Sequence, residues 1–176
     1  MFANAEPKDY SVASSLNAEQ KFISFQLGVS DTALLPLEGV AELFQVSLTE
    51  ILPVPEVPSC VLGIYNWREE MLWLVDLNAL SGLTPLIQSA SLLLAPMTMV
   101  VQAGGQFMGL VVSQVKDIEM RSLQQMNNPD AGVFTPEILP LLKGYFIGAN
   151  NEVIRIFEPA AIIQAPLWHQ PSRKQV

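Results

Sequence analysis

Short runs of alternating hydrophobic and polar residues recur along most of the chain, which is the pattern of half-buried β-strands. In residues 21–27, for example, Ile23 and Phe25 fall on one face of the predicted strand, whereas Ser24 and Gln26 fall on the other. Glycine, proline and asparagine separate these runs and mark turns. The predicted strands are residues 21–27, 33–38, 40–46, 61–66, 71–77, 97–103, 107–115, 117–121, 144–149 and 152–157.

Turn residues predict how several of these strands connect. Residues 67–70 are expected to be the tip of one hairpin, and the pair Gly104-Gly105 the tip of another. The segment 53–58 contains three prolines, which predicts an extended loop rather than a central strand. Two helical segments are predicted, a single turn at 78–82 and a short C-terminal helix at 159–164 with a proline in its first turn.

One long uncharged stretch raises the question of a membrane span. No charged residue occurs between Asp76 and Lys116, and residues 92–112 are apolar enough to cross a bilayer as a helix. Pro96 and the Gly104-Gly105 pair interrupt this stretch, so two strands around a turn are the better prediction. We therefore expect no direct membrane insertion.

The two halves of the chain repeat one plan. Short strands separated by turn residues at this spacing predict an all-β fold of two small barrels or curled sheets. Each half would be marginally stable alone, so we expect the two to share buried surface. Three pairs of segments carry the repeat, 40–43 with 115–118, 62–65 with 143–146, and 74–76 with 156–158.

Composition and charge narrow the classes of function. Half of the residues are hydrophobic and 15% are charged, which predicts a globular domain with a sizeable core. The net charge is -8, because residues 1–80 hold 11 acidic and 3 basic residues, whereas residues 81–176 hold six of each. An acidic chain without a basic stripe repels phosphates, so no nucleic acid partner is expected.

Few side chains are available for catalysis or for binding a metal or cofactor. Cys60 and His169 are the single cysteine and histidine, too few for a zinc site and without a visible catalytic partner. Asp31-Thr-Ala resembles the aspartate motif of retroviral-type proteases, but the second aspartate could come only from a homodimer. Gly104-Gly105 lacks the lysine and the helix of a phosphate-binding loop. We expect no enzyme, no cofactor and no metal.

The most informative segment is Gly63-Ile-Tyr-Asn-Trp-Arg-Glu-Glu-Met-Leu-Trp-Leu-Val-Asp-Leu77. It resembles the signature of the CheW family, Gly-x-x-Asn-Leu-Arg-Gly-x-x-x-Pro-x-x-Asp-Leu. Glu69 replaces the glycine of that signature and Trp73 replaces its proline, so the turn after Arg68 is expected to differ in shape. The positions that match in register are Gly63, Asn66, Arg68, Asp76 and Leu77.

The resemblance extends over residues 21–165. Val40-Ala-Glu42-Leu43 matches the family's Val-x-Glu-Ile strand, and residues 109–115 are similar to its Gly-hydrophobic-Val-Asp-x-Val strand. It implies a fold of two five-stranded β-barrel-like subdomains with a shared hydrophobic core. It also implies a non-catalytic cytoplasmic adaptor, coupling chemoreceptors to a histidine kinase in chemotaxis or pilus-based motility.

Two partners follow from the resemblance, the regulatory domain of a CheA-type kinase and the cytoplasmic tip of a chemoreceptor. A small β-barrel module for an unknown ligand is the alternative, and it would need a central apolar cavity. The expected organisation is a polar N-terminal extension at 1–20, a first subdomain at 21–90, a second at 91–158 with the helix 159–164, and a flexible tail at 166–176.

Four residues are expected to bind partners: Val40, Glu42, Trp67 and Arg68. Arg68 is the only basic residue between Lys21 and Lys116, and we predict that it pairs with Glu42 on a neighbouring strand rather than remaining a solvated turn residue. In the family, the matching arginine and glutamate face each other near the receptor-binding surface. Trp67, at a hairpin tip, is expected either to be an exposed interface anchor or to cover a barrel end.

Three further residues are expected to shape turns. By the resemblance, Gly63 begins the signature. Asn66 is expected to order the hairpin turn through its side-chain amide. Asp76 is expected to end its strand or to cap the short helix that follows.

Overall fold

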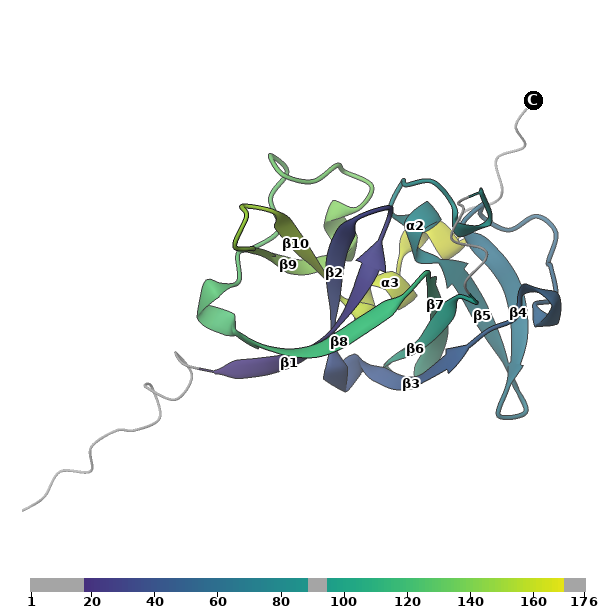
Figure 1. Cartoon of the computed structure of the whole chain (residues 1–176). Helices are drawn as coiled ribbons and strands as arrows, with labels where there is room; N and C mark the ends of the chain where they lie inside the picture. Colours follow the sequence, from purple (N-terminus) through teal and green to yellow (C-terminus); the bar gives the residue numbers. More distant parts are fainter. Residues whose placement is uncertain (1–17, 89–94, 170–176) are drawn as a thin grey trace, which may run out of the picture.

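The computed structural model describes residues 18–88 and 95–169, and its ten strands form two curled sheets (Figure 1). Sheet A has the strand order β8-β1-β2-β10-β9, and sheet B has the order β3-β6-β7-β5-β4. This confirms the expected all-β fold of two five-stranded units. The strands are β1 Glu19–Leu27, β2 Asp31–Pro36, β3 Val40–Gln45, β4 Val61–Trp67, β5 Glu70–Asp76, β6 Met97–Ala103, β7 Gln106–Val112, β8 Val115–Ser122, β9 Leu142–Ile147 and β10 Val153–Phe157.

Alternation along the strands divides the apolar side chains among three cores. In β1, Phe22 packs inside sheet A, whereas Ile23 and Phe25 belong to the largest cluster, which both sheets share. That shared core also takes in Met99 and Leu110 of sheet B and the C-terminal helix. The shared hydrophobic core predicted from the sequence is therefore present, and it joins the two sheets into one unit.

The strands do not follow the expected division of the chain at residue 90. Sheet A takes β1 and β2 from the N-terminal end and β8, β9 and β10 from the C-terminal end, whereas sheet B is the continuous segment 40–112. The division at 21–90 and 91–158 is therefore wrong. Its cause is the break after β2: Pro36 and the 3₁₀ turn Leu37–Gly39 end this strand, and the chain then crosses to the other sheet.

The internal repeat is real but circularly permuted. Matching the two strand orders makes β3, β4 and β5 equivalent to β8, β9 and β10, as the repeated segments predict. The remaining equivalents of β6 and β7 are β1 and β2, which precede the rest of their repeat in sequence. The parallel pairs β5–β7 and β2–β10 occupy the same place in the two sheets. The N-terminal hairpin thus completes a unit whose other strands lie some eighty residues or more further on.

The helical segments lie where the sequence predicts them. Helix α2 is Leu77–Leu80 and α3 is Pro159–Ile163, with a proline at its start. A 3₁₀ turn at Pro166–His169 follows α3, and Trp168 Nε1 donates a hydrogen bond of 2.7 Å to the Ile162 carbonyl. The expected tail at 166–176 is therefore wrong for its first four residues, which form this turn, with Leu167 and Trp168 packed against the core. Residues 170–176 lie outside the described residues, as do 1–17 of the N-terminal extension.

The uncharged stretch around residues 92–112 forms strands. Its described part, from residue 95, contains β6 and β7, which pair as an antiparallel hairpin around Gly104-Gly105. Residues 89–94 lie outside the described part. Within residues 18–88 and 95–169, no helix is long and apolar enough to cross a membrane.

Candidate partner-binding site

Glu42, Trp67 and Arg68 form a cluster on sheet B. One carboxylate oxygen of Glu42, Oε2, accepts a hydrogen bond of 2.7 Å from Trp67 Nε1 and lies 3.0 Å from Nη2 of Arg68. The Arg68 guanidinium carbon lies 4.7 Å from the centre of the Trp67 ring, in a cation–π contact. Three side chains thus hold one another, and the ion pair predicted from the sequence is present.

The cluster joins the two edges of sheet B. Glu42 is on β3 and Arg68 follows β4, and these strands lie at opposite ends of the strand order rather than side by side as we expected. A second contact bridges the same edges, since the rings of Phe44 and Tyr65 stack with their centres 5.1 Å apart. The described residues contain no hydrogen-bonded ladder between β3 and β4, so side chains close this seam.

Trp67 is buried, with 7% of its surface exposed, and the expectation of an exposed interface anchor is wrong. Its ring belongs to the core inside sheet B and packs 5.1 Å from the ring of Phe107. Glu42 satisfies the indole N–H, which allows the ring to lie at the end of the sheet without an unpaired donor. The alternative prediction, that Trp67 covers a barrel end, is the one the structure supports.

Arg68 and Glu69 make the hairpin turn between β4 and β5. Both have positive φ angles, 50° and 66°, the backbone of a type I′ turn that fits the twist of a hairpin. Asn66 does not order this turn, because it is an exposed residue of β4 paired with Met71, and its side chain makes no hydrogen bond to any described residue. That expectation is therefore wrong.

The Glu42–Arg68 pair is expected to contribute modestly to stability. Arg68 is 64% exposed and Glu42 35% exposed, so solvent screens the pair. A double-mutant cycle of Glu42→Ala and Arg68→Ala, measured by chemical unfolding, should give a coupling of about 0.5–1 kcal/mol. Strictly additive effects of the two substitutions would contradict an energetic link between them.

Asp76 caps α2, as one of the two sequence interpretations predicts. Its Oδ1 accepts a hydrogen bond of 3.1 Å from the Ala79 amide, and its Oδ2 accepts one of 2.7 Å from the Leu86 amide. The carboxyl is buried, which raises its pKa, while these amide hydrogen bonds act in the opposite direction. Asp76 thus fixes both the helix and the segment that follows it, which is a structural role.

Cys60 lies beside Asp76, whose amide donates a hydrogen bond of 2.8 Å to the Cys60 carbonyl. Burial above all, with a smaller contribution from the nearby Asp76 charge and against a backbone hydrogen bond that lowers it, raises the pKa of the Cys60 thiol to about 11 from an ordinary value of 9.0. This environment disfavours the thiolate, which is the reactive form of cysteine, so it does not suit a nucleophile.

This raised pKa predicts a loss of stability at alkaline pH. Above pH 9 the unfolded thiol ionises while the folded one stays protonated, so the free energy of unfolding falls as pH rises toward 11. The fall attributable to Cys60 should approach about 2 kcal/mol. Measuring the free energy of unfolding of the wild type and of Cys60→Ala at pH 8 and pH 10.5 isolates this fall. If the difference in free energy between the two proteins is the same at both pH values, the loss of stability does not come from Cys60.

Val40 begins β3, where it pairs with Val101 and is half-buried against the shared core. Gly63 lies in β4 beside an isolated bridge between Leu52 and Ile64, so its role is close packing within the sheet. The structure thus brings Glu42, Trp67 and Arg68 together and places these two residues elsewhere on sheet B.

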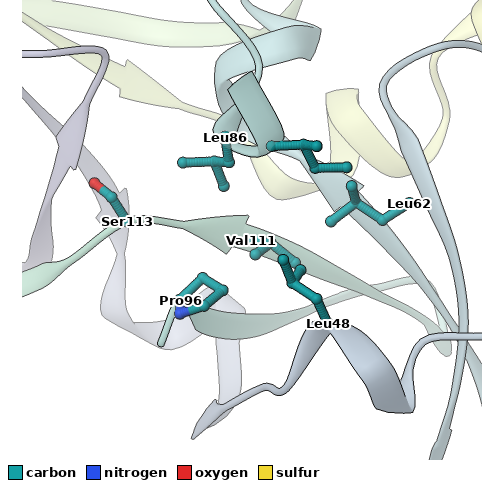
Figure 2. Close-up of a pocket in the computed structure, with 7 residues that line it drawn as sticks. Leu48, Leu62, Leu86, Pro96, Val111 and Ser113 are labelled. Atoms are coloured by element: carbon teal, nitrogen blue, oxygen red, sulfur yellow. The ribbon is translucent and has the colours of Figure 1, made fainter. Parts of the chain in front are cut away.

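The interior of sheet B is filled by side chains. Figure 2 shows a pocket between its strands, where Leu48, Leu62, Leu86 and Val111 converge. Its volume is about 10 Å³, enough for one water molecule at most, so this pocket does not offer the central cavity that a ligand-binding module requires. Among the described residues, no three His, Cys, Asp or Glu side chains gather to hold a metal ion.

The sequence did not predict the exposed apolar group on β5 and β7, although Trp73 was expected, like Trp67, to cover a barrel end. Met71 and Trp73 on β5 are 64% and 41% exposed, and Phe107 on β7 is 38% exposed. The signal was available, because Met71 and Trp73 alternate with the buried Leu72 and Leu74 and therefore share the outer face of one strand.

An all-β fold of two curled sheets, with a charged cluster at a sheet seam, favours a protein-interaction domain over an enzyme. Residues 21–167 match the CheW-like domain family, and the chain belongs to that family. Its domain is therefore a non-catalytic scaffolding and adaptor domain of chemotaxis signal transduction. The crystal structure of the scaffolding protein TtCheW from Thermoanaerobacter tengcongensis is similar in fold, with a TM-score of 0.66 and 22% identity over 80% of this chain and 90% of that one. The search of curated proteins found no match.

Proposed function

We propose that this protein is a cytoplasmic adaptor that couples a chemoreceptor to a CheA-type histidine kinase, in chemotaxis or in pilus-based motility. It binds the regulatory domain of the kinase and the cytoplasmic tip of the receptor, without nucleic acid or membrane insertion. The cluster of Glu42, Trp67 and Arg68 is the observation that carries this proposal. Two of its members, Glu42 and Arg68, occupy the positions that the family resemblance assigns to the receptor side.

The geometry of the cluster suits a binding role for Arg68. The side chain is 64% exposed, yet it is held from two directions by the Glu42 carboxylate and the Trp67 ring. An arginine ordered before binding loses less conformational freedom when it meets a partner. Only part of its guanidinium is used by Glu42, so further N–H donors are available for a carboxylate or carbonyl of the receptor. Trp67 acts here as a support beneath Arg68 rather than as a contact.

An adaptor needs two surfaces that differ, and the two sheets provide them. The segment 40–112, which forms sheet B, holds six acidic residues and one basic residue. The segments 19–36 and 115–157, which form sheet A, hold seven acidic and five basic residues. The difference in net charge between the two halves of the sequence is therefore a difference between the two sheets. We expect each sheet to select a partner whose charge complements its own.

Receptor binding tests the proposal. A cytoplasmic fragment of a chemoreceptor from the same organism should bind Arg68→Ala at least about tenfold more weakly than the wild type, the cost of losing one ordered charged contact. Arg121→Ala is the matched control, because Arg121 also pairs with a carboxylate, Glu119 at 2.8 Å, but lies on sheet A. Equal losses in the two variants, or none in Arg68→Ala, would contradict the assigned role.

A further inference from the structure

A groove of about 540 Å³ opens on the outer face of sheet B, on the side of β5 and β7 where the C-terminal segment packs. Its floor is rigid, because it includes Val75, Met108 and Ile163, which are buried in the core shared by the two sheets. Trp168, fixed by its hydrogen bond to the Ile162 carbonyl, lines the groove as well. The groove is therefore formed by residues that are fixed by the packing of the domain.

Three of the exposed apolar side chains of this domain lie at the groove, whereas others, such as Leu52 and Ile118, lie elsewhere. Met71, Trp73 and Phe107 all line it, and they are 64%, 41% and 38% exposed. Large aromatic residues beside a flexible methionine are the usual composition of a protein-binding surface. Trp73 stands where the family signature has proline, so this surface is a property of this chain rather than of the signature.

The charge around the groove indicates what would bind there. Glu70 lines the groove, and sheet B carries only one basic residue, Arg68, which is paired with Glu42. Glu70 is the one acid among the described residues that line the groove; His169 lines it as well, and none of these residues is a lysine or arginine. A positively charged side chain approaching the groove would therefore meet the Glu70 carboxylate without a competing lysine or arginine in the lining. A negatively charged segment would be repelled.

We propose that the groove binds a short segment of another protein, in which a bulky apolar side chain is flanked by lysine or arginine. The apolar side chain packs on Trp73 and Met71, and the cationic side chain pairs with Glu70. The groove adjoins the cluster of Glu42, Trp67 and Arg68, because Phe107 packs on Trp67. The proposed contacts are made by Met71, Trp73 and Glu70, none of which belongs to the cluster, and the proposal does not depend on receptor binding by that cluster.

Methyl spectra of the full chain, with labelled methionines, test the proposal using acetylated and amidated Lys-Phe-Leu-Lys as the probe. The peptide should shift the Met71 methyl signal in a saturable manner. Glu-Phe-Leu-Glu and Lys-Ser-Ser-Lys should bind at least about fivefold more weakly, since each lacks one of the two required features. Glu70→Lys should reverse the preference between the basic and the acidic peptide.

Two variants of groove residues and one control variant distinguish peptide binding in the groove from unspecific binding to exposed apolar residues. Trp73→Thr preserves a strand-forming residue and should abolish saturable binding, and Met71→Ser, read from the Met108 methyl signal, should weaken it. Ile147→Thr, on β9 of sheet A, removes a residue that is 49% exposed and should leave binding unchanged. An unperturbed Met71 signal, equal binding of the acidic peptide, or full binding by both groove variants would overturn the proposal. So would a Met71 shift that depends on protein concentration without peptide, which would identify a second copy as the occupant.

Discussion

Replacing Gly63 with alanine is expected to lower the free energy of unfolding by about 3 kcal/mol or more, through backbone strain and steric overlap together. Gly63 has a φ angle of 142°, a conformation that L-residues with side chains rarely adopt. A methyl group there would overlap the carbonyl oxygen of Leu52 and lie 3.0 Å from Cγ2 of Ile51. Leu52 is unable to withdraw freely, because it exchanges two backbone hydrogen bonds of 2.9 Å with Ile64.

Gly82→Ala is the matched control for this substitution. Gly82 also has a positive φ angle, 75°, but among the described residues, its two chain neighbours aside, no atom lies within 4 Å of the position that its Cβ would occupy. Gly82→Ala should lower the free energy of unfolding by about 1 kcal/mol, because it introduces backbone strain without steric overlap. Chemical unfolding of both variants measures the difference, and equal costs would contradict the close approach of Leu52 to Gly63.

Deleting the N-terminal hairpin is expected to unfold sheet A. β1 and β2 lie at the centre of that sheet, between β8 and β10, so their loss leaves β8 without a hydrogen-bonding partner and β10 paired with β9 alone. They also supply Phe22 and Leu34 to the core inside sheet A and Phe25 to the shared core. A chain starting at residue 38 should show no native amide signals for β8 to β10.

Two controls accompany the deletion. A chain starting at residue 18 keeps every described element and should retain the spectrum of the full protein. Adding a peptide of residues 18–38 to the truncated chain should restore the signals of sheet A. Native signals from β8 to β10 in the truncated chain, without the peptide, would contradict the permuted arrangement of the repeat.

Local patterns in the sequence predicted much of this structure. The hairpin around residues 67–70, the helix cap by Asp76 and the ion pair of Glu42 with Arg68 each depend on residue types at short spacing or on the scarcity of one charge. The pairing of β2 with β10 was not predictable in this way, because the two strands lie more than a hundred residues apart and pair in parallel. The repeated segments therefore indicated two units and matched β3, β4 and β5 with β8, β9 and β10 correctly, but dividing the chain at residue 90 assigned β1, β2, β6 and β7 to the wrong units.

The burial of Trp67 shows why the site was predicted only in part. Its place at a hairpin tip suggests exposure, and the sequence alone does not show that Glu42 would reach across from the opposite edge of the sheet to accept its N–H. Phe107, forty residues later, completes the burial. Trp73, six residues after Trp67, lies on the outer face of β5 and is the more exposed of the two.

Simultaneous binding of both partners tests the account most directly. Sedimentation velocity of this protein with the regulatory domain of a CheA-type kinase and a cytoplasmic chemoreceptor fragment, both from the same organism, would reveal the complexes that form. We expect a ternary species that is absent from each pairwise mixture. Failure to bind either partner, or displacement of one by the other, would contradict the adaptor function.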